Sequence, residues 1–297
     1  MIAERFREIS PNIVCNEPMS AHTTFKVGGM ADMFVSVGSA EELVGLIKLA
    51  NETKTPFIVI GNGSNLLVSD NGIRGLVIEI GEKMADISVC GSEICAGAGV
   101  LLSKVASVAL KNSLTGLEEI SGIPGTLGGG IYMNAGAYGG EIKDAVESVT
   151  YVDDNGDIHT ITGDECDFGY RKSIFTGGGK YIVSAKLSLS VGNSDEIKSK
   201  MMEFKKRRTE KQPLSYPSAG STLKRPEGYY AAALLEDAGL KGVKIGGAMV
   251  STLHSGFVIN CGGATCEDIV ALINHIKQTV REKFGVELET EVKLVGE

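Results

Sequence analysis

The first third of the chain alternates short apolar runs with amphipathic segments, which predicts strands and helices in turn. Residues 33–37 read as a strand, and Ser39 then forms a helix N-cap with Glu42 three residues later. The apolar side chains that follow recur on one helical face, at Leu43, Leu46, Ile47 and Ala50. Residues 57–60 form a second apolar run with strand character. The pattern predicts a helix packed against a sheet.

The middle of the chain consists mainly of short β runs separated by turn residues. We expect a buried helix at residues 100–110 and strands at residues 75–80, 87–89, 94–96, 149–153 and 158–161. Asp154-Asn155-Gly156 lies between the last two strands and predicts a hairpin. Residues 181–191 alternate as one long, half-buried strand would.

A predicted helix at residues 195–211 precedes a change of composition at Pro213. Its many lysines and arginines favour a solvated face, with a contact to a phosphate group as the alternative. Beyond Pro213 the pattern is α+β. We expect helices at 229–238 and 265–284, and strands at 247–251, 256–260 and 286–294. Thr265 and Asp268 form a capping box for the last helix, and Gly285 ends it.

Length and composition describe a globular chain with unusually many glycines. Its 297 residues suffice for about two domains. The 39 glycines are nearly twice the usual share of about 7%, so loops must account for them. No apolar run approaches the ~18 residues that span a bilayer, and the charged N-terminal segment is unlike a signal peptide. We therefore expect a cytoplasmic protein with no membrane partner.

Charge and cysteine spacing exclude other classes. The net charge of −8 argues against general nucleic-acid binding, so an anionic ligand would need a local basic patch. The six cysteines include no C-x-x-C pair and have no histidine cluster beside them. We expect reduced structural thiols and no metal site.

Two glycine-rich segments are candidates for binding a phosphorylated ligand. Residues 121–140 read SGIPGTLGGGIYMNAGAYGG, in which apolar residues would anchor a loop whose backbone N–H groups approach a ligand closely. After the apolar run at 57–60, the segment Gly61-Asn62-Gly63-Ser64-Asn65 is a plausible diphosphate cradle. A tight turn would use the same residues, and neither the P-loop nor the G-x-G-x-x-G pattern is present.

Three later segments carry further candidates. The turn at 168–173 presents Arg171, which suits carboxylate recognition or a surface turn equally. The loop at 218–226 places Ser221 near Lys224 and Arg225, without a Ser-His-Asp set. Along the predicted terminal strand, Glu287, Glu289 and Glu291 share one face, which would ordinarily be solvent-exposed. A lone His254 is more often structural than a substrate contact.

Taken in order, seven motifs resemble the UDP-N-acetylenolpyruvoylglucosamine reductase family. They are HTTFKVGG, GNGSNLLV, SGIPGTLGGGIYMNAGAYGGEI, FGYRKSIF, SAGSTLKRP, HSGFVIN and LETEV. The resemblance implies an α+β fold with a two-subdomain FAD-binding region of the vanillyl-alcohol-oxidase-like, non-Rossmann type. An α+β substrate domain would follow it. The implied domains are residues 1–75 and 76–205 for FAD, and 206–297 for the UDP-sugar.

The resemblance also implies the site and its chemistry. FAD would be held by Gly61, Asn62, Gly63, Ser64, Asn65, Ile123, Pro124, Gly125, Thr126 and Gly128. NADPH would reduce the flavin, which would pass a hydride to the enolpyruvyl group of the UDP-sugar in peptidoglycan synthesis. Arg171 would stabilise the enolate-like state, and so would Glu291 if it is protonated or donates through a bridging group, while Ser221 donates a proton. The weaker candidates for substrate contact are Tyr170, Lys224, Arg225 and His254.

One departure and two alternatives bear on this interpretation. Only residues 176–180 separate the FGYRKSIF motif from the next strand, so the chain resembles the shorter-loop subtype, which lacks an inserted tyrosine that closes over the substrate. An FAD-dependent alcohol oxidase and a non-enzymatic sugar-nucleotide-binding module remain open. So does the choice between NADPH and NADH. We expect a monomer.

Overall fold

The computed structural model describes residues 2–297 and divides into two compact units. Unit 1 contains residues 2–15, Met33–Asn62 and Gly75–Arg208, and unit 2 contains Asn16–Asp32, Gly63–Arg74 and Thr209–Glu297. Each unit has its own hydrophobic core. The three ligand-based domains, with boundaries at residues 75 and 205, stay a prediction because these units are defined by contacts and not by ligands.

The N-terminal part of the chain matches the predicted alternation of strands and helices. The first sheet has the order β1-β2-β5-β3, in which β3 (Phe57–Ile60) and β5 (Ile73–Glu79) run parallel; the other strands are β1 (Val14–Pro18) and β2 (Met30–Ser36). Helix α2 (Ala40–Thr53) packs against α1 (Ile2–Ile9). The Ser39 hydroxyl accepts the N–H of Glu42 at 3.2 Å, which confirms the predicted N-cap.

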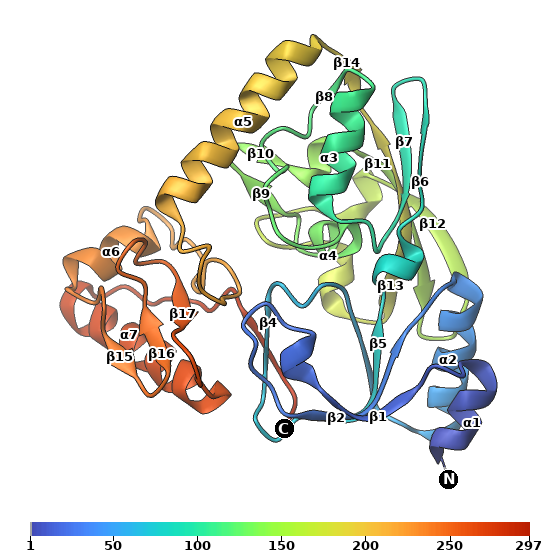
Figure 1. Ribbon diagram of the computed structural model, residues 1–297, viewed down its shortest axis with the longest axis horizontal. Helices are drawn as coiled ribbons and strands as arrows, with labels where there is room; N and C mark the ends of the chain where they lie inside the picture. The colour runs from blue at the N-terminus through green and yellow to red at the C-terminus, as the bar shows by residue number, and fades with distance from the viewer. Residues whose placement is uncertain (1) are drawn as a thin grey trace. The chain divides into compact units, whose positions relative to one another are not determined.

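A second, antiparallel sheet in unit 1 has the order β12-β11-β13-β7-β6 (Figure 1). Its strands are β6 (Ile87–Cys90), β7 (Glu93–Gly97), β11 (Val146–Asp153), β12 (Ile158–Thr162) and β13 (Lys180–Ser188). The predicted hairpin between β11 and β12 is confirmed. The single strand expected at 181–191 is wrong. β13 ends at Ser188 opposite Glu93, where its partner β7 begins, and β14 (Ser190–Val191) pairs with β8 (Leu114–Thr115) instead.

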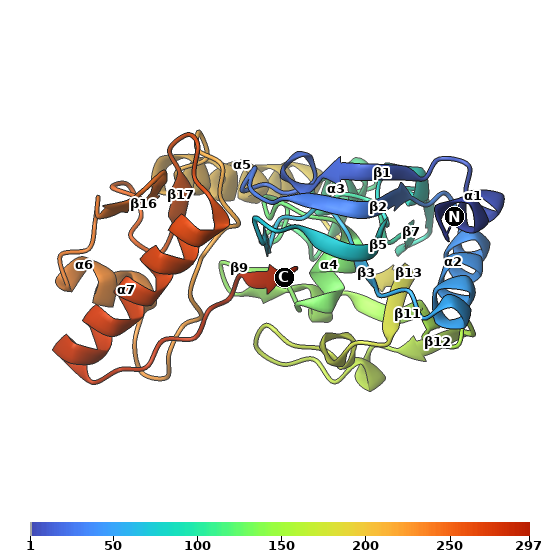
Figure 2. The same cartoon turned by 90° about the horizontal axis from the view of Figure 1, so that it is seen from below.

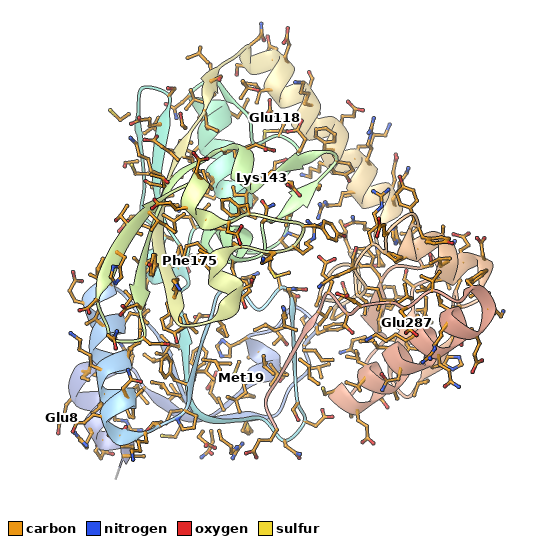
Figure 3. All side chains as sticks on the ribbon, turned by 180° about the vertical axis from the view of Figure 1, so that it is seen from behind. Glu8, Met19, Glu118, Lys143, Phe175 and Glu287 are labelled. Carbon is orange, nitrogen blue, oxygen red and sulfur yellow. The ribbon has the colours of Figure 1, made fainter. Side chains whose placement is uncertain are left out.

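The glycine-rich segment at 121–140 is only partly a loop, which corrects the sequence-based expectation. It contains helix α4 (Leu127–Tyr132), and α4 contacts α3 (Leu102–Lys111) and β13. Short strands β9 (Gly136–Ala137) and β10 (Gly140–Glu141) follow it. Phe175, fully buried and labelled in Figure 3, belongs to the same core. The segment is therefore anchored by packing, as its apolar residues predict.

Unit 2 combines a three-stranded antiparallel sheet with helices. Strands β15 (Lys244–Ile245), β16 (Ala248–Val250) and β17 (Val258–Asn260) form the sheet, and α7 (Cys266–Phe284) lies alongside β16 (Figure 2). Helix α6 (Ala231–Asp237) also contacts α7. The capping box of Thr265 and Asp268 is confirmed, and Gly285 ends α7 in the left-handed conformation at φ +68°.

The terminal strand expected at 286–294 is largely wrong. Only β18 (Lys293–Val295) is a strand, and it runs parallel to the three residues of β4 (Leu66–Val68). Of the apolar residues that alternate with the glutamates, Leu288 and Val292 are buried, but Leu294 is 59% exposed. Because β4 supplies only three partner residues, the segment before β18 has no strand to pair with and forms single contacts to a loop instead.

The remaining elements are short, apart from one helix. Helix α5 (Ser194–Lys211) carries the basic residues noted in the sequence, and the 3₁₀ turns are Met19–Ala21, Glu82–Met84, Ile142–Asp144, Asp164–Cys166 and Ile174–Gly177. Among residues 2–297, no helix has the length and apolar character needed to cross a bilayer. In the same residues, no group of three or more His, Cys, Asp or Glu side chains is arranged to hold a metal ion.

Candidate active site

Gly61, the first residue after β3, packs directly against Thr126. A Cβ atom at Gly61 would lie 2.5 Å from Thr126 Oγ1, so no larger residue fits without displacing that side chain. Thr126 is 3% exposed, and its hydroxyl accepts the N–H of Gly129 at 3.3 Å as the N-cap of α4. Residues from both glycine-rich segments thus meet within unit 1. This contact is expected if the two segments bind the same ligand.

Two successive buried residues at this contact have N–H groups that make no hydrogen bond among residues 2–297. They are Gly125, in the left-handed region at φ +126°, and Thr126. The next two N–H groups are used: Leu127 donates to Val100 O at 2.7 Å and Gly128 to Ala98 O at 2.9 Å. Buried N–H groups are normally paired. The pair therefore suits a ligand that accepts hydrogen bonds, and the close packing at Gly61 and Gly128 suits a backbone cradle for FAD.

The rest of the 61–65 segment leads into unit 2. Asn62 is exposed. Gly63 adopts φ +60°, and a Cβ there would lie 2.0 Å from His22 O, so glycine is required. Ser64 is partly buried, and Asn65 directly precedes β4. The amide of Asn65 donates to the main-chain oxygen of Glu291 at 3.1 Å, a contact that connects this segment to a predicted catalytic residue.

Arg171 occupies a strained turn in unit 1. Gly169 and Lys172 exchange main-chain hydrogen bonds across it, and Arg171 adopts φ +54°, a conformation that is unfavourable for a residue with a side chain. Its guanidinium donates to Gly136 O at 3.1 Å and lies 5.1 Å from the ring centroid of Tyr170, which is 51% exposed. Backbone strain of this kind clusters at functional sites.

Buried Asn134 supports the Arg171 turn, a role that the sequence reading missed. Its amide donates to Gly169 O at 3.0 Å and to Glu141 Oε2 at 3.1 Å. Glu141 is also paired with Lys143, labelled in Figure 3, at 2.6 Å. Burial alone would raise the pKa of the Glu141 carboxyl. Hydrogen bonds from Lys143 and Asn134, and the positive charges of Lys143 and Arg171, lower that pKa overall.

In unit 2, the segments that carry Ser221 and Glu291 are neighbours. Ser221 is exposed, whereas the next residue, Thr222, is buried and accepts the N–H of Glu291 on its main-chain oxygen at 2.9 Å. Two residues after Thr222 and two residues before Glu291, Lys224 N–H donates to Glu289 O at 2.8 Å. The side chains of Lys224 and Glu289 also form an ion pair at 2.8 Å. A hydrogen bond and the charge of Lys224 lower the pKa of the Glu289 carboxyl.

The two remaining predicted substrate residues have local partners within unit 2. The Arg225 guanidinium lies 3.9 Å from the ring centroid of Tyr230, a cation–π contact. His254 Nδ1 accepts the N–H of Gly256 at 3.1 Å, and its ring packs edge-on against Phe257. Burial lowers the pKa of His254, which favours a neutral imidazole at neutral pH. His254 thus has a structural role in its own turn.

Comparison with known proteins decides the family. An FAD binding domain model matches residues 31–162, and a model of the UDP-N-acetylenolpyruvoylglucosamine reductase C-terminal domain matches residues 212–295. The UDP-N-acetylenolpyruvoylglucosamine reductase of Caldanaerobacter subterraneus subsp. tengcongensis is 52% identical over 100% of this chain and 99% of its own length. The chain belongs to the UDP-N-acetylenolpyruvoylglucosamine reductase family.

Solved structures agree with this assignment. The UDP-N-acetylenolpyruvylglucosamine reductase of Thermus caldophilus matches with a TM-score of 0.82 and 35% identity, covering 95% of this chain and 98% of that one. A glucose oxidase variant of Phl p 4 matches with a TM-score of 0.51 at 15% identity over 65% of this chain and 44% of its own, a likeness of fold alone. The predicted family, the α+β FAD-binding fold and the FAD-dependent reductase class are confirmed.

Proposed function

We propose that this reductase converts the enolpyruvyl ether of UDP-N-acetylglucosamine to the D-lactyl ether of UDP-N-acetylmuramate, with NADPH as the reductant, in peptidoglycan precursor synthesis. The observation that carries the proposal is the pair of N–H groups of the buried residues Gly125 and Thr126, unpartnered among residues 2–297 and beside Gly61, in a chain of this family. When bound, FAD supplies hydride transfer from NADPH to the terminal carbon of the substrate double bond.

FAD is assigned to the two glycine-rich segments. Gly61, Gly125, Thr126 and Gly128 provide close backbone approach or N–H donors. The neighbouring residues of the same segments are assigned by resemblance, namely Asn62, Gly63, Ser64, Asn65, Ile123 and Pro124. Backbone N–H groups suit this role because they hold the acceptor atoms of a large planar ligand without charged side chains.

Arg171, Ser221 and Glu291 are assigned to the reaction. The substrate carboxylate gains enolate character as hydride adds to the double bond, and Arg171 binds and stabilises that carboxylate. The Ser221 hydroxyl gives a proton to the carbon next to the carboxylate. Glu291, protonated or donating through a bridging group, stabilises the enolate-like carboxylate. Hydride and proton together complete the reduction of the double bond. The exposure of Ser221 leaves its hydroxyl accessible to a ligand.

Tyr170, Lys224, Arg225 and His254 are assigned to the UDP-sugar. Lys224 and Arg225 supply positive charge for its diphosphate, although Lys224 must first exchange its pairing with Glu289. The division into FAD subdomains at 1–75 and 76–205 and a substrate domain at 206–297 belongs to this proposal. So do a monomeric state and a cytoplasmic location.

Steady-state kinetics test the proposal. The purified chain, reconstituted with FAD, should show visible flavin absorbance and should consume NADPH only when UDP-N-acetylglucosamine enolpyruvate is present. Production of UDP-N-acetylmuramate should equal NADPH consumption. NADPH consumption that is indifferent to the sugar nucleotide, or a folded chain that never takes up FAD, contradicts the proposal.

A further inference from the structure

Asn65, the last residue of the glycine-rich segment 61–65, makes two hydrogen bonds to the chain at and just after Glu291. Its amide Nδ2 donates to the main-chain oxygen of Glu291 at 3.1 Å, and its own main-chain oxygen accepts the N–H of Lys293 at 2.9 Å. These contacts lie within unit 2 and join residues that are 226 positions apart in the first case. A segment assigned to FAD therefore also holds the main chain of the proposed catalytic acid.

The Asn65 side chain extends a short β ladder beyond its end. Strands β4 and β18 pair only from Leu66 opposite Lys293 to Val68 opposite Val295. Glu291 lies outside β18, so no partner strand reaches its carbonyl group. The amide of Asn65 supplies the hydrogen bond that a further strand residue would have made. Without this amide, the Glu291 carbonyl would lose its hydrogen bond to the residue that precedes β4.

The other main-chain group of Glu291 is held by the neighbour of Ser221. Glu291 N–H donates to Thr222 O at 2.9 Å. Thr222 is itself fixed, since it is 1% exposed, its N–H donates to Gly256 O and its hydroxyl accepts the N–H of Val258 at 2.9 Å. Glu291 is thus held between Thr222 on one side and Asn65 on the other. Only the Asn65 contact depends on a side chain, so a substitution can remove it alone.

We infer that Asn65 is a positioning residue: its amide holds the Glu291 main chain so that the Glu291 carboxyl group meets the substrate in one orientation. The inference rests on the proposed role of Glu291. An orientation error of about 1 Å at a catalytic group slows a reaction about 100-fold. Loss of the amide should therefore slow the step that uses Glu291 and spare the step that does not, which is reduction of the flavin by NADPH.

Two variants test this inference. For each, rapid mixing at saturating FAD and without oxygen measures the rates of flavin reduction and of flavin reoxidation. Asn65→Ala removes the amide, and Asn65→Asp keeps its size but removes the donor. In both, reduction of the flavin by NADPH should slow at least tenfold less than its reoxidation does, even though Asn65 belongs to a segment assigned to FAD. Its reoxidation by the enolpyruvyl sugar nucleotide should slow about 10- to 100-fold. In a Glu291→Ala background, Asn65→Ala should cause no further slowing, because its effect passes through Glu291.

A matched control and a second measurement separate positioning from general destabilisation. Asn260, a buried residue of unit 2, has a side-chain amide that likewise donates to a main-chain oxygen, that of Phe25, at 3.0 Å. Asn260→Ala should lower the melting temperature and leave the ratio of the two rates unchanged. In the FAD-free chain, hydrogen exchange at Glu291 N–H should be faster in Asn65→Ala than in wild type, because the segment is held at one end only.

Three results would overturn the inference. The first is Asn65→Ala reoxidising at the wild-type rate while Glu291→Ala is slow. The second is a full Asn65→Ala effect in the Glu291→Ala background, which would mean that Asn65 acts independently of Glu291. The third is a wild-type reoxidation rate in Glu291→Ala itself, which would also refute the proposed role of Glu291. The Glu291→Ala variant alone distinguishes this result from the first two.

Discussion

Gly61→Ala should impair FAD binding because it adds one methyl group where the two glycine-rich segments meet. The new Cβ would lie 2.5 Å from Thr126 Oγ1. Thr126 is buried, and turning its β-branched side chain away would break the hydrogen bond from Gly129 N–H that caps α4. Overpacking of this kind costs about 1–3 kcal/mol. If that cost falls on the conformation that binds FAD, affinity drops about 5- to 150-fold.

Fluorescence titration of the FAD-free chain with FAD measures this effect. Gly177→Ala is the matched control, since a Cβ at Gly177 would meet no atom within 4 Å. The control should bind FAD as wild type does. The double variant Gly61→Ala/Thr126→Ala should lose less affinity than the sum of its two single variants, because removing Oγ1 relieves the clash. Wild-type FAD affinity in Gly61→Ala would refute the assignment of this contact to the cradle.

Three further substitutions address the chemistry and the stability of the two units. Arg171→Lys keeps the charge but loses the planar fork, so reoxidation of the flavin by substrate should slow about 100-fold while its reduction by NADPH is retained in rapid mixing. Asp70→Ala removes the carboxylate that accepts the N–H groups of Cys266 and Glu267 at the start of α7, and should cost about 1 kcal/mol in urea unfolding. Burial tends to raise the pKa of Glu118, labelled in Figure 3, but hydrogen bonds from Thr115 and Gly116 lower it overall. Its stabilising contribution is therefore complete above the unfolded pKa of about 4.3 and is lost as pH falls through the lower folded value. The wild-type melting temperature should accordingly fall more between pH 5 and pH 3 than that of Glu118→Gln; equal slopes would contradict this.

Elements with local signals could be predicted from the sequence. The capping box of Thr265 and Asp268 and the stop at Gly285 define α7 because all the hydrogen bonds at its ends are made within a few residues. The Asp154-Asn155-Gly156 turn defines its hairpin for the same reason. Such signals do not depend on what the rest of the chain does.

Elements that depend on packing against distant parts of the chain could not be predicted from the sequence. Helix α4 contains three glycines, which disfavour helix on intrinsic propensity. Its glycines are required by packing, because a Cβ at Gly128 would lie 2.9 Å from Ala98 Cβ and one at Gly130 would lie 3.1 Å from Leu102. The extent of β18 is likewise set by the three residues of β4, which no periodicity within 286–294 reveals.

Some residues of the candidate site could likewise be predicted from local sequence signals, and others could not. Arg171 and Ser221 lie in segments with local turn signals, which the sequence exposes. The sequence pattern alone cannot choose Glu291 over Glu289, and only the family resemblance does so. The structure adds that Glu289 is ion-paired with Lys224. The contacts of Asn134 with Glu141 and of Asn65 with Glu291 depend on the fold, and spacing predicts neither.

The most direct test of the account is an oxygen-free, two-step rapid-mixing measurement on wild type and Ser221→Ala. NADPH should bleach the flavin absorbance of both proteins at similar rates. UDP-N-acetylglucosamine enolpyruvate should then restore the absorbance in wild type, and at least 100-fold more slowly in Ser221→Ala, since general acid catalysis contributes about 10²- to 10⁴-fold. Equal recovery in the two proteins would contradict the assigned proton donor, and no recovery in wild type would contradict the proposed reaction.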